Sequence, residues 1–424
     1  MNASHFVQKP IVRTSLRIAV LTGCALLISW QSLSRSQEPK RPVLSSAPQA
    51  PLRWHLESPP LRWFKGNTHV HTELCGHADS TPAAVTQWYH ERGYNFLCLS
   101  EHNQYVDPAT VELPKNKRSD FMLIPGQEIT GHHTIHTTAL NTKSLVDWRH
   151  KHEKKSEVIQ NHVDGTHHAH GVPILNHPNF HYAISAEDML PVKRLHLFEL
   201  YNGHPGVNNL GDDKHPSTEQ IWDTLLSAGA LIYGVSSDDA HQFKKWAKNA
   251  SNPGRGWIMV RSAAFTADAI TQAIHRGDFY ASSGVMLREV SFQDGRYRVV
   301  VDEAATAREL ASPILYGRRI NKDDAGERKA GYSITFIGPG GKILQTSQST
   351  SAEFKVNQDS AYVRCKVTYI RNAKVAAGAD SSSISADSNA DREEFASWTQ
   401  PVFTDDRIEK ARLAEQQEKT RTTQ

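Results

Sequence analysis

Short apolar runs alternate with helical patterns over residues 61–285, and each run ends in polar or charged residues. Runs of this length are typical of buried strands, and they occupy residues 95–100, 121–126, 172–175, 195–203 and 230–235. Helical periodicity lies between them at residues 81–91, 146–170 and 219–229, and again at 267–276. In the first helix, Thr81 suits the N-cap and Pro82 the first turn. The alternation predicts an α/β domain that carries its chemistry at the strand ends.

The pattern changes after residue 285 to short alternating segments separated by turns such as Asp294-Gly295. Such segments predict a small β-sandwich over residues 286–405. A stretch rich in Ser, Ala and Asp at 376–391 predicts a flexible insertion, and residues 406–424 predict a charged tail. No candidate chemistry falls in this second part.

The N-terminus has the layout of a secretory signal peptide over residues 1–34. Arg13 and Arg17 precede an apolar run at 18–30, and the small-x-small site Ser32-Leu33-Ser34 follows. The run is too short to span a bilayer comfortably, so we expect a secreted or periplasmic chain with no stable membrane span after processing. An uncleaved anchor, or a lipoprotein attached at Cys24, is the alternative. The proline-rich residues 35–60 predict an extended linker.

The charge balance argues against nucleic acid as a partner. The 424 residues include 48 basic and 45 acidic side chains, and residues 1–34 hold three of the basic ones and none of the acidic ones. Without that segment the count is 45 against 45. A neutral chain lacks the basic face that general nucleic-acid binding needs.

Histidine is concentrated in the first part of the chain. Twenty of the 23 histidines lie between His69 and His241, and none follows His275. His69 and His71 are two residues apart on an extended segment, so their side chains point to one face, as two ligands of one metal would. His77 follows after Gly76. Alone, the pair would fit a polar surface strand equally well. The histidines of residues 146–170 are expected on a solvated helix face.

Further candidate ligands occur where the predicted strands end. They are His102, Glu128, His136, His177, Asp239 and His241. Asp238 is an alternative to Asp239, although the D-x-H spacing favours Asp239. Cys75 lies between the histidines and is a possible metal-adjacent thiol. Imidazole together with carboxylate suits Zn, Mn or Fe, whereas an all-oxygen set would suit Mg or Ca.

The ordered series HxHxxxxxH, SEHN, PGxE, NHP and SDDAH, between Lys65 and Val285, resembles the polymerase and histidinol phosphatase (PHP) superfamily, with the carbaryl-hydrolase-like branch nearest. The resemblance implies a distorted (βα)7 barrel and two or three divalent metal ions. It places His69, His71, Glu128 and Asp239 on one metal. His77, His102 and His241 would hold a second, and Glu128 would bridge to a third held by His136 and His177. The family usually has Asp where this chain has Glu101, which we expect to orient His102.

This site predicts a metal-dependent hydrolase, with phosphoester hydrolysis of a small-molecule substrate by a metal-bridging hydroxide as the first expectation. Hydrolysis of a carbamate or carboxylic ester on the same site is one alternative. A non-catalytic metal-binding or ligand-binding envelope protein is another. Candidate cations for stabilising substrate oxygens are His204, Lys214 and Arg255. Nothing in the sequence indicates an oligomeric state.

Overall fold

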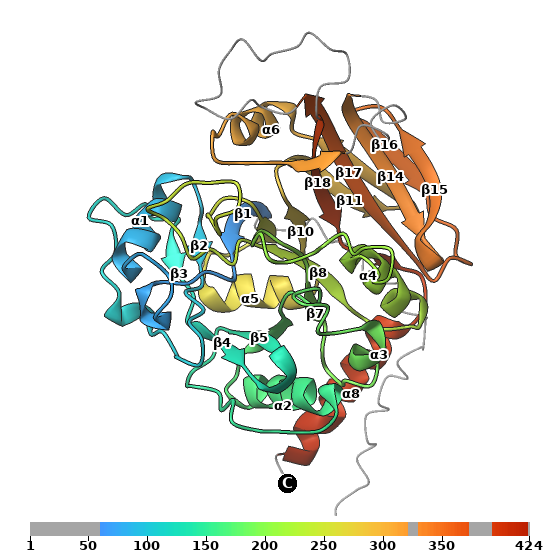
Figure 1. Ribbon diagram of the computed structural model, residues 1–424. Helices are drawn as coiled ribbons and strands as arrows, with labels where there is room; N and C mark the ends of the chain where they lie inside the picture. Colours follow the sequence, from blue (N-terminus) through green and yellow to red (C-terminus); the bar gives the residue numbers. More distant parts are fainter. Residues whose placement is uncertain (1–59, 321–329, 373–391, 423–424) are drawn as a thin grey trace, which may run out of the picture. The chain divides into compact units, whose positions relative to one another are not determined.

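A computed structural model describes residues 60–320, 330–372 and 392–422 (Figure 1). The predicted signal peptide with Cys24, the linker up to residue 59 and the predicted insertion at 376–391 lie outside the described residues. The described residues all belong to one unit of the chain, residues 50–424. They form a mixed α/β structure with three sheets.

The first part of the chain contributes a five-stranded sheet with the order β4-β5-β6-β7-β8. Its strands are β4 (Gly126–Thr130), β5 (His136–Leu140), β6 (Val172–Leu175), β7 (Leu197–Asn202) and β8 (Tyr233–Ser237). β4, β5 and β6 pair antiparallel, whereas β6, β7 and β8 pair parallel. Most of these strand residues are buried, and β6, β7 and β8 overlap the apolar runs that predicted them. β4 is richer in polar residues and begins where the predicted run at 121–126 ends.

An eleven-stranded sheet extends through both parts of the chain, in the order β15-β14-β17-β18-β10-β9-β1-β2-β3 with β13 and β19 at its side. From the first part come β1 (Arg62–Asn67), β2 (Phe96–Leu97), β3 (Met122–Leu123), β9 (Trp257–Ser262) and β10 (Phe279–Ser282). From the second come β13 (Arg318–Ile320), β14 (Gly331–Gly338), β15 (Lys342–Ser347), β17 (Tyr362–Asn372), β18 (Arg392–Thr399) and β19 (Val402–Phe403). β18 pairs antiparallel with β10, so this sheet is continuous between the two parts.

The closed (βα)7 barrel that the resemblance implied is not evident, because the sheets of the first part are open. Single bridges, and not ladders, connect them: Val70 pairs with Ala240, and His102 with Glu128. β2 and β3 are only two residues long, and β4 and β5 form an antiparallel pair that interrupts the βα alternation.

The helices begin close to the residues that their capping signals predict. α1 (Pro82–Glu91) has Thr81 at its N-cap, and the Thr81 hydroxyl accepts from the Ala84 amide at 3.1 Å. A capping box begins α4 (Thr218–Ser227). The other α-helices of the described first part are α3 (Ala186–Met189), α5 (Ala267–His275) and α2, which is discussed next.

α2 (Lys155–His168) begins later than the periodicity from residue 146 predicts. Val146 exchanges two hydrogen bonds with the Gln127 side chain, at 2.7 and 3.0 Å, and these hold the preceding segment against β4 instead of in a helix. His162 was expected on the solvated face but is buried, 3.1 Å from the Thr137 hydroxyl.

Two sheets pack face to face in the second part, in the arrangement of a sandwich (Figure 1). The smaller sheet contains β11 (Leu287–Gln293), β12 (Arg296–Val301) and β16 (Ser351–Lys355), and α6 (Glu303–Leu310) follows β12. Phe336 of β14 lies between the rings of Tyr297 and Phe354 of this sheet, with centroid distances of 5.7 and 5.4 Å. These aromatic contacts form the core between the two sheets.

Polar contacts also tie the second part to the first. Buried Arg364 of β17 binds Asp223 of α4 through two nitrogens, at 2.6 and 2.8 Å.

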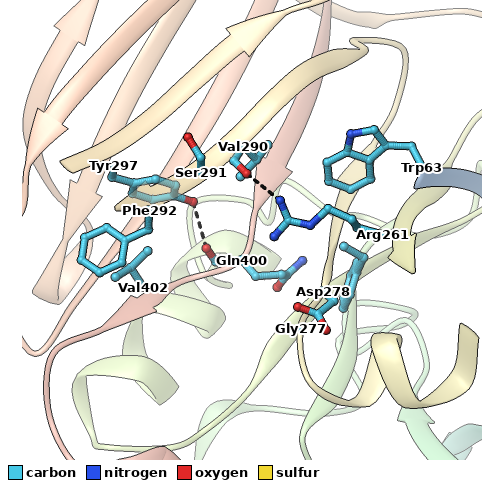
Figure 2. A pocket seen from close by; sticks show the side chains of 11 residues that line it. Trp63, Arg261, Gly277, Asp278, Val290, Ser291, Phe292, Tyr297, Gln400 and Val402 are labelled. Carbon is cyan, nitrogen blue, oxygen red and sulfur yellow. Dashed lines mark hydrogen bonds between the residues drawn. The ribbon is translucent and has the colours of Figure 1, made fainter. Parts of the chain in front are cut away.

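Figure 2 shows the small cavity beside β9, in which Arg261 donates to the Val290 carbonyl at 3.0 Å. The cavity has a volume of about 10 Å³, which is room for one water molecule and no larger ligand.

The predicted charged tail forms a helix, α8 (Arg407–Thr422). Ion pairs between Lys410 and Asp406 at 2.8 Å, and between Arg412 and Glu409 at 2.6 Å, lie at helical spacing. Buried Arg407 donates to the carbonyls of residues 226 and 230 and so attaches the helix to the end of α4. No helix in the described part of the chain combines the length and apolar character needed to cross a membrane.

Candidate metal centre

His69 and His71 lie just after β1, where the chain runs beside the residues that follow β8. The His71 amide donates to the Ala240 carbonyl at 3.0 Å, and the His69 amide donates to the Asn67 side chain at 3.1 Å. Both imidazoles are fully buried. Their Nε2 atoms are 3.1 Å apart, so the two rings converge on one point.

Glu128 and Asp239 complete a four-residue group around that point. His69 Nε2 lies 3.2 Å from Glu128 Oε1 and 3.4 Å from Asp239 Oδ1. His71 Nε2 lies 3.5 Å from Glu128 Oε2 and 3.3 Å from Asp239 Oδ1. Ligand atoms around a tetrahedral metal with bonds of about 2.0–2.1 Å are about 3.3–3.4 Å apart. The four residues therefore have the chemistry and spacing to hold a divalent ion.

Glu128 also contacts histidines on the far side of this group. Its Oε2 lies 2.7 Å from His102 Nδ1, and its Oε1 lies 3.2 Å from His136 Nδ1 and 3.3 Å from His177 Nε2. One buried carboxylate thus faces ligand nitrogens on several sides. A carboxylate in this position could supply a ligand oxygen to more than one of these histidine groups.

A third group lies on the other side of His71. The rings of His71 and His241 stack at 4.2 Å, and those of His71 and His102 at 4.5 Å. One ligand atom from each of these three residues lies within 4.8 Å of the others, and Cys75, His77 and His241 meet the same limit. The exposed His77 therefore lies beside both His241 and Cys75.

Burial and mutual charge set the protonation of these residues. Burial opposes ionisation of Glu128 and Asp239, but the neighbouring histidines outweigh it and hold both pKa values well below the usual range. Burial lowers the pKa of His71 well below its usual value and that of His241 to about 4. Although burial opposes it, Asp239, Glu128 and Glu199 raise the pKa of His69 well above its usual value. Charged carboxylates and neutral imidazoles are the forms that bind metals, so only His69 must lose a proton among these five.

Backbone strain occurs at the same place. Asp239 has φ = 48° and His177 has φ = 24°, a region that side-chain-bearing residues seldom adopt. Such conformations cost on the order of 1–3 kcal/mol each and persist only where surrounding contacts enforce them. Here they aim two candidate ligands inward.

Glu199 of β7 was not among the residues predicted for the site, yet it supports the centre. Its carboxylate accepts from His69 Nδ1, the His177 amide and Asn202 Nδ2, each at 2.8 Å, and from the Ser237 hydroxyl. The bond to Nδ1 leaves His69 Nε2 facing the centre. The signal available in the sequence was a carboxylate inside an apolar run, three residues before Asn202 at the end of the same strand.

Glu101 lies against His71 and not against His102. Its Oε1 accepts from the Thr72 amide at 2.9 Å, and its Oε2 is 4.0 Å from His71 Nδ1. His102 Nδ1 instead lies 2.6 Å from the Thr130 hydroxyl. Burial raises the pKa of Glu101 to about 7. The expectation that Glu101 orients His102 is therefore wrong, because β4 supplies that contact.

The Asp238 carboxylate accepts hydrogen bonds from the loop between β8 and β9 and not from the candidate ligands. It accepts from the Tyr89 hydroxyl at 2.7 Å and from the amides of residues 254–256 at 2.6–2.8 Å. These bonds turn its carboxylate toward the loop and leave Asp239 as the carboxylate that faces the histidines.

The three candidate cations occupy different surroundings. The ring of His204 is 5.8 Å from that of His241, at the edge of the centre. Arg255 is buried, and its guanidinium donates to the Ala247 carbonyl at 2.8 Å, which directs it into the loop behind Asp238. Lys214 is exposed, and among the residues that the structure describes no hydrogen bond or ion pair joins its ammonium group to the centre. Only His204 is brought to the candidate ligands.

Comparison with known proteins adds a distant structural likeness. No protein-family model matches the chain, and no curated protein matches it. A solved structure from Bacteroides vulgatus, described as a two-domain protein containing a predicted PHP-like metal-dependent phosphoesterase, aligns with 76% of this chain and 94% of its own. The sequence identity is 13% and the TM-score is 0.37.

Proposed function

We propose that this protein is a metal-dependent hydrolase that cleaves phosphoesters of small molecules. The observation that carries the proposal is the position of Glu128, whose two oxygens face His69, His71 and His102 as well as the pair His136 and His177. A shared carboxylate between imidazole groups is the arrangement expected for two or three neighbouring divalent ions. The ordered motifs that resemble the PHP superfamily support the same reaction class.

In this proposal the buried residues hold the metal centre and the exposed edge receives substrate. His69, His71, Glu128 and Asp239 would hold one ion, and His77, His102 and His241 a second. His136 and His177 would hold a third, to which Glu128 would also contribute. Bound ions of this kind activate water and stabilise charge on the oxygens of an ester undergoing displacement. His204 lies at the edge of the centre, and burial lowers its pKa, so a neutral ring would donate a hydrogen bond to a substrate oxygen there.

The test uses the full chain, loaded separately with Zn²⁺, Mn²⁺ or Fe²⁺ and assayed on phosphate monoesters, phosphate diesters, aryl esters and carbamates. We expect bound metal by elemental analysis and turnover of a phosphoester. His69→Ala and Asp239→Ala should each lose metal and activity, whereas His168→Ala, at an exposed position of α2, should keep both. Turnover of esters or carbamates alone would favour the other hydrolase reaction. Metal without turnover on any substrate would indicate a binding protein, and less than about one metal per chain would refute the centre.

A further inference from the structure

Cys75 lies in a short turn that presents it to the metal centre. It ends the 3-10 helix η1 (Glu73–Cys75), which Thr72 caps, and Gly76 follows with φ = 83°. The left-handed conformation of Gly76 reverses the chain, so that Cys75 and His77 lie on the same side of the turn. The Cys75 sulfur lies within 4.8 Å of ligand nitrogens of both His77 and His241.

A buried imidazole nitrogen beside this sulfur lacks a partner. His241 Nδ1 lies 3.0 Å from the Asp239 carbonyl oxygen, but His241 Nε2 has no hydrogen-bond partner among the described residues. The Glu101 carboxylate also lies beside the sulfur, and the Cys75 thiol is its hydrogen-bond neighbour. Glu101 is fully buried and His241 is 8% exposed. Leaving such an atom unsatisfied lowers stability, so native structures rarely do so without a functional reason. A cation bound by Cys75, His77 and His241 would give His241 Nε2 a partner.

We propose that Cys75 is a thiolate ligand of a divalent metal ion, together with His77 and His241. This inference rests on the metal centre proposed above and assigns a ligand that the motif series does not contain. On binding, the thiol gives its proton to solvent and a sulfur–metal bond forms, with no change of oxidation state. Sulfur with imidazole favours Zn²⁺, whereas Mn²⁺ prefers oxygen ligands. This position should therefore select Zn²⁺ over Mn²⁺.

The other described cysteines supply the control. Cys98 and Cys365 are fully buried, and Cys365 lies on β17 in the second part of the chain. We would load the full chain with Co²⁺ and record the near-ultraviolet band that a thiolate ligand gives. The wild-type chain and Cys365→Ala should show the band, and Cys75→Ala should lose it.

A second measurement on the unaltered protein avoids dependence on a variant. Alkylation of Cys75 by iodoacetamide, followed by peptide mass analysis, should slow at least about tenfold when Zn²⁺ is added, because the ligated thiolate is shielded. Cys75→Ala should weaken Zn²⁺ binding at least about tenfold and leave Mn²⁺ binding nearly unchanged.

Bound Co²⁺ without a thiolate band, or alkylation at the same rate with and without Zn²⁺, would overturn the assignment of Cys75 while leaving the proposed hydrolase intact. A thiolate band and bound metal, without turnover of any ester, would support Cys75 as a ligand and overturn the proposed reaction instead.

Discussion

Replacing Glu199 by glutamine tests whether this buried carboxylate supports the metal centre. Oε1 accepts from His69 Nδ1 and the Ser237 hydroxyl, and Oε2 accepts from the His177 amide and Asn202 Nδ2. Glutamine has nearly the same volume but only one accepting atom. Whichever way the amide turns, its NH₂ group meets two groups that donated to the carboxylate.

The size of the effect follows from the lost bonds. Each buried donor left without an acceptor costs about 1–3 kcal/mol. Ser237 can turn its hydroxyl and accept instead, so one donor at least remains unpaired. Loss of a residue that orients a metal ligand usually weakens metal binding by about 10–100-fold, or about 1.4–2.7 kcal/mol. We expect Glu199→Gln to weaken Zn²⁺ binding within that range and to lower the free energy of unfolding of the metal-free chain by about 1–3 kcal/mol.

Zn²⁺ affinity would be measured by competition with a chromophoric chelator, and stability by urea unfolding of the metal-free protein. Glu187→Gln is the matched control, because Glu187 is exposed on α3. If Glu199→Gln bound Zn²⁺ with the wild-type dissociation constant, the role assigned to this carboxylate would be refuted. A loss of stability with unchanged affinity would restrict the residue to folding.

Three further changes test other contacts. Lys214→Ala should leave metal content and activity unchanged, contrary to the sequence-based expectation. The side chain is exposed, and no hydrogen bond or ion pair of the described residues joins its ammonium group to the centre. A loss of activity above about tenfold, or about 1.4 kcal/mol, would refute this prediction. Glu219→Gln should destabilise the chain by at most about 3 kcal/mol near pH 7. Burial raises the pKa of Glu219, but the positive charges of Lys366, 2.5 Å away, and Arg364 have the larger effect and lower that pKa to about 2. Because the pKa of Glu219 is lower in the folded state, this stabilisation is full above about pH 4.5 and is lost as the pH falls toward 2. The difference in the free energy of unfolding between the wild-type chain and Glu219→Gln, measured by urea unfolding, should therefore be smaller at pH 3 than at pH 7. An equal difference at both pH values would contradict this prediction. Gly256→Ala should lower the free energy of unfolding by about 1–3 kcal/mol, since a Cβ there would lie 2.3 Å from the Ser237 carbonyl oxygen, and an unchanged melting temperature would argue against that close approach.

Local signals predicted the elements that depend on few residues. The cap at Thr81 and the apolar runs of β6 and β7 lie where the patterns indicate, because capping and strand burial are decided within a few positions. The tail was predicted without a helix, because the sequence of α8 has no clear apolar face. Ion pairs such as Lys410–Asp406 lie along this helix instead. The barrel did not follow from the strand pattern, because closure depends on pairing between segments far apart in the chain.

The metal centre also combines features set by the local sequence with features set by contacts between distant segments. The spacing of His69 and His71 determined by itself that the two imidazoles lie on one side of the segment, since alternate residues of an extended chain share a side. The structure brings their Nε2 atoms to 3.1 Å from each other. Only the tertiary structure decided that Glu199, 130 residues from His69, holds that ring, and that Glu101 faces His71 instead of His102. Sequence spacing sets the direction of a side chain relative to its own strand. The partner it meets depends on how distant strands are packed, and that is a property of the whole fold.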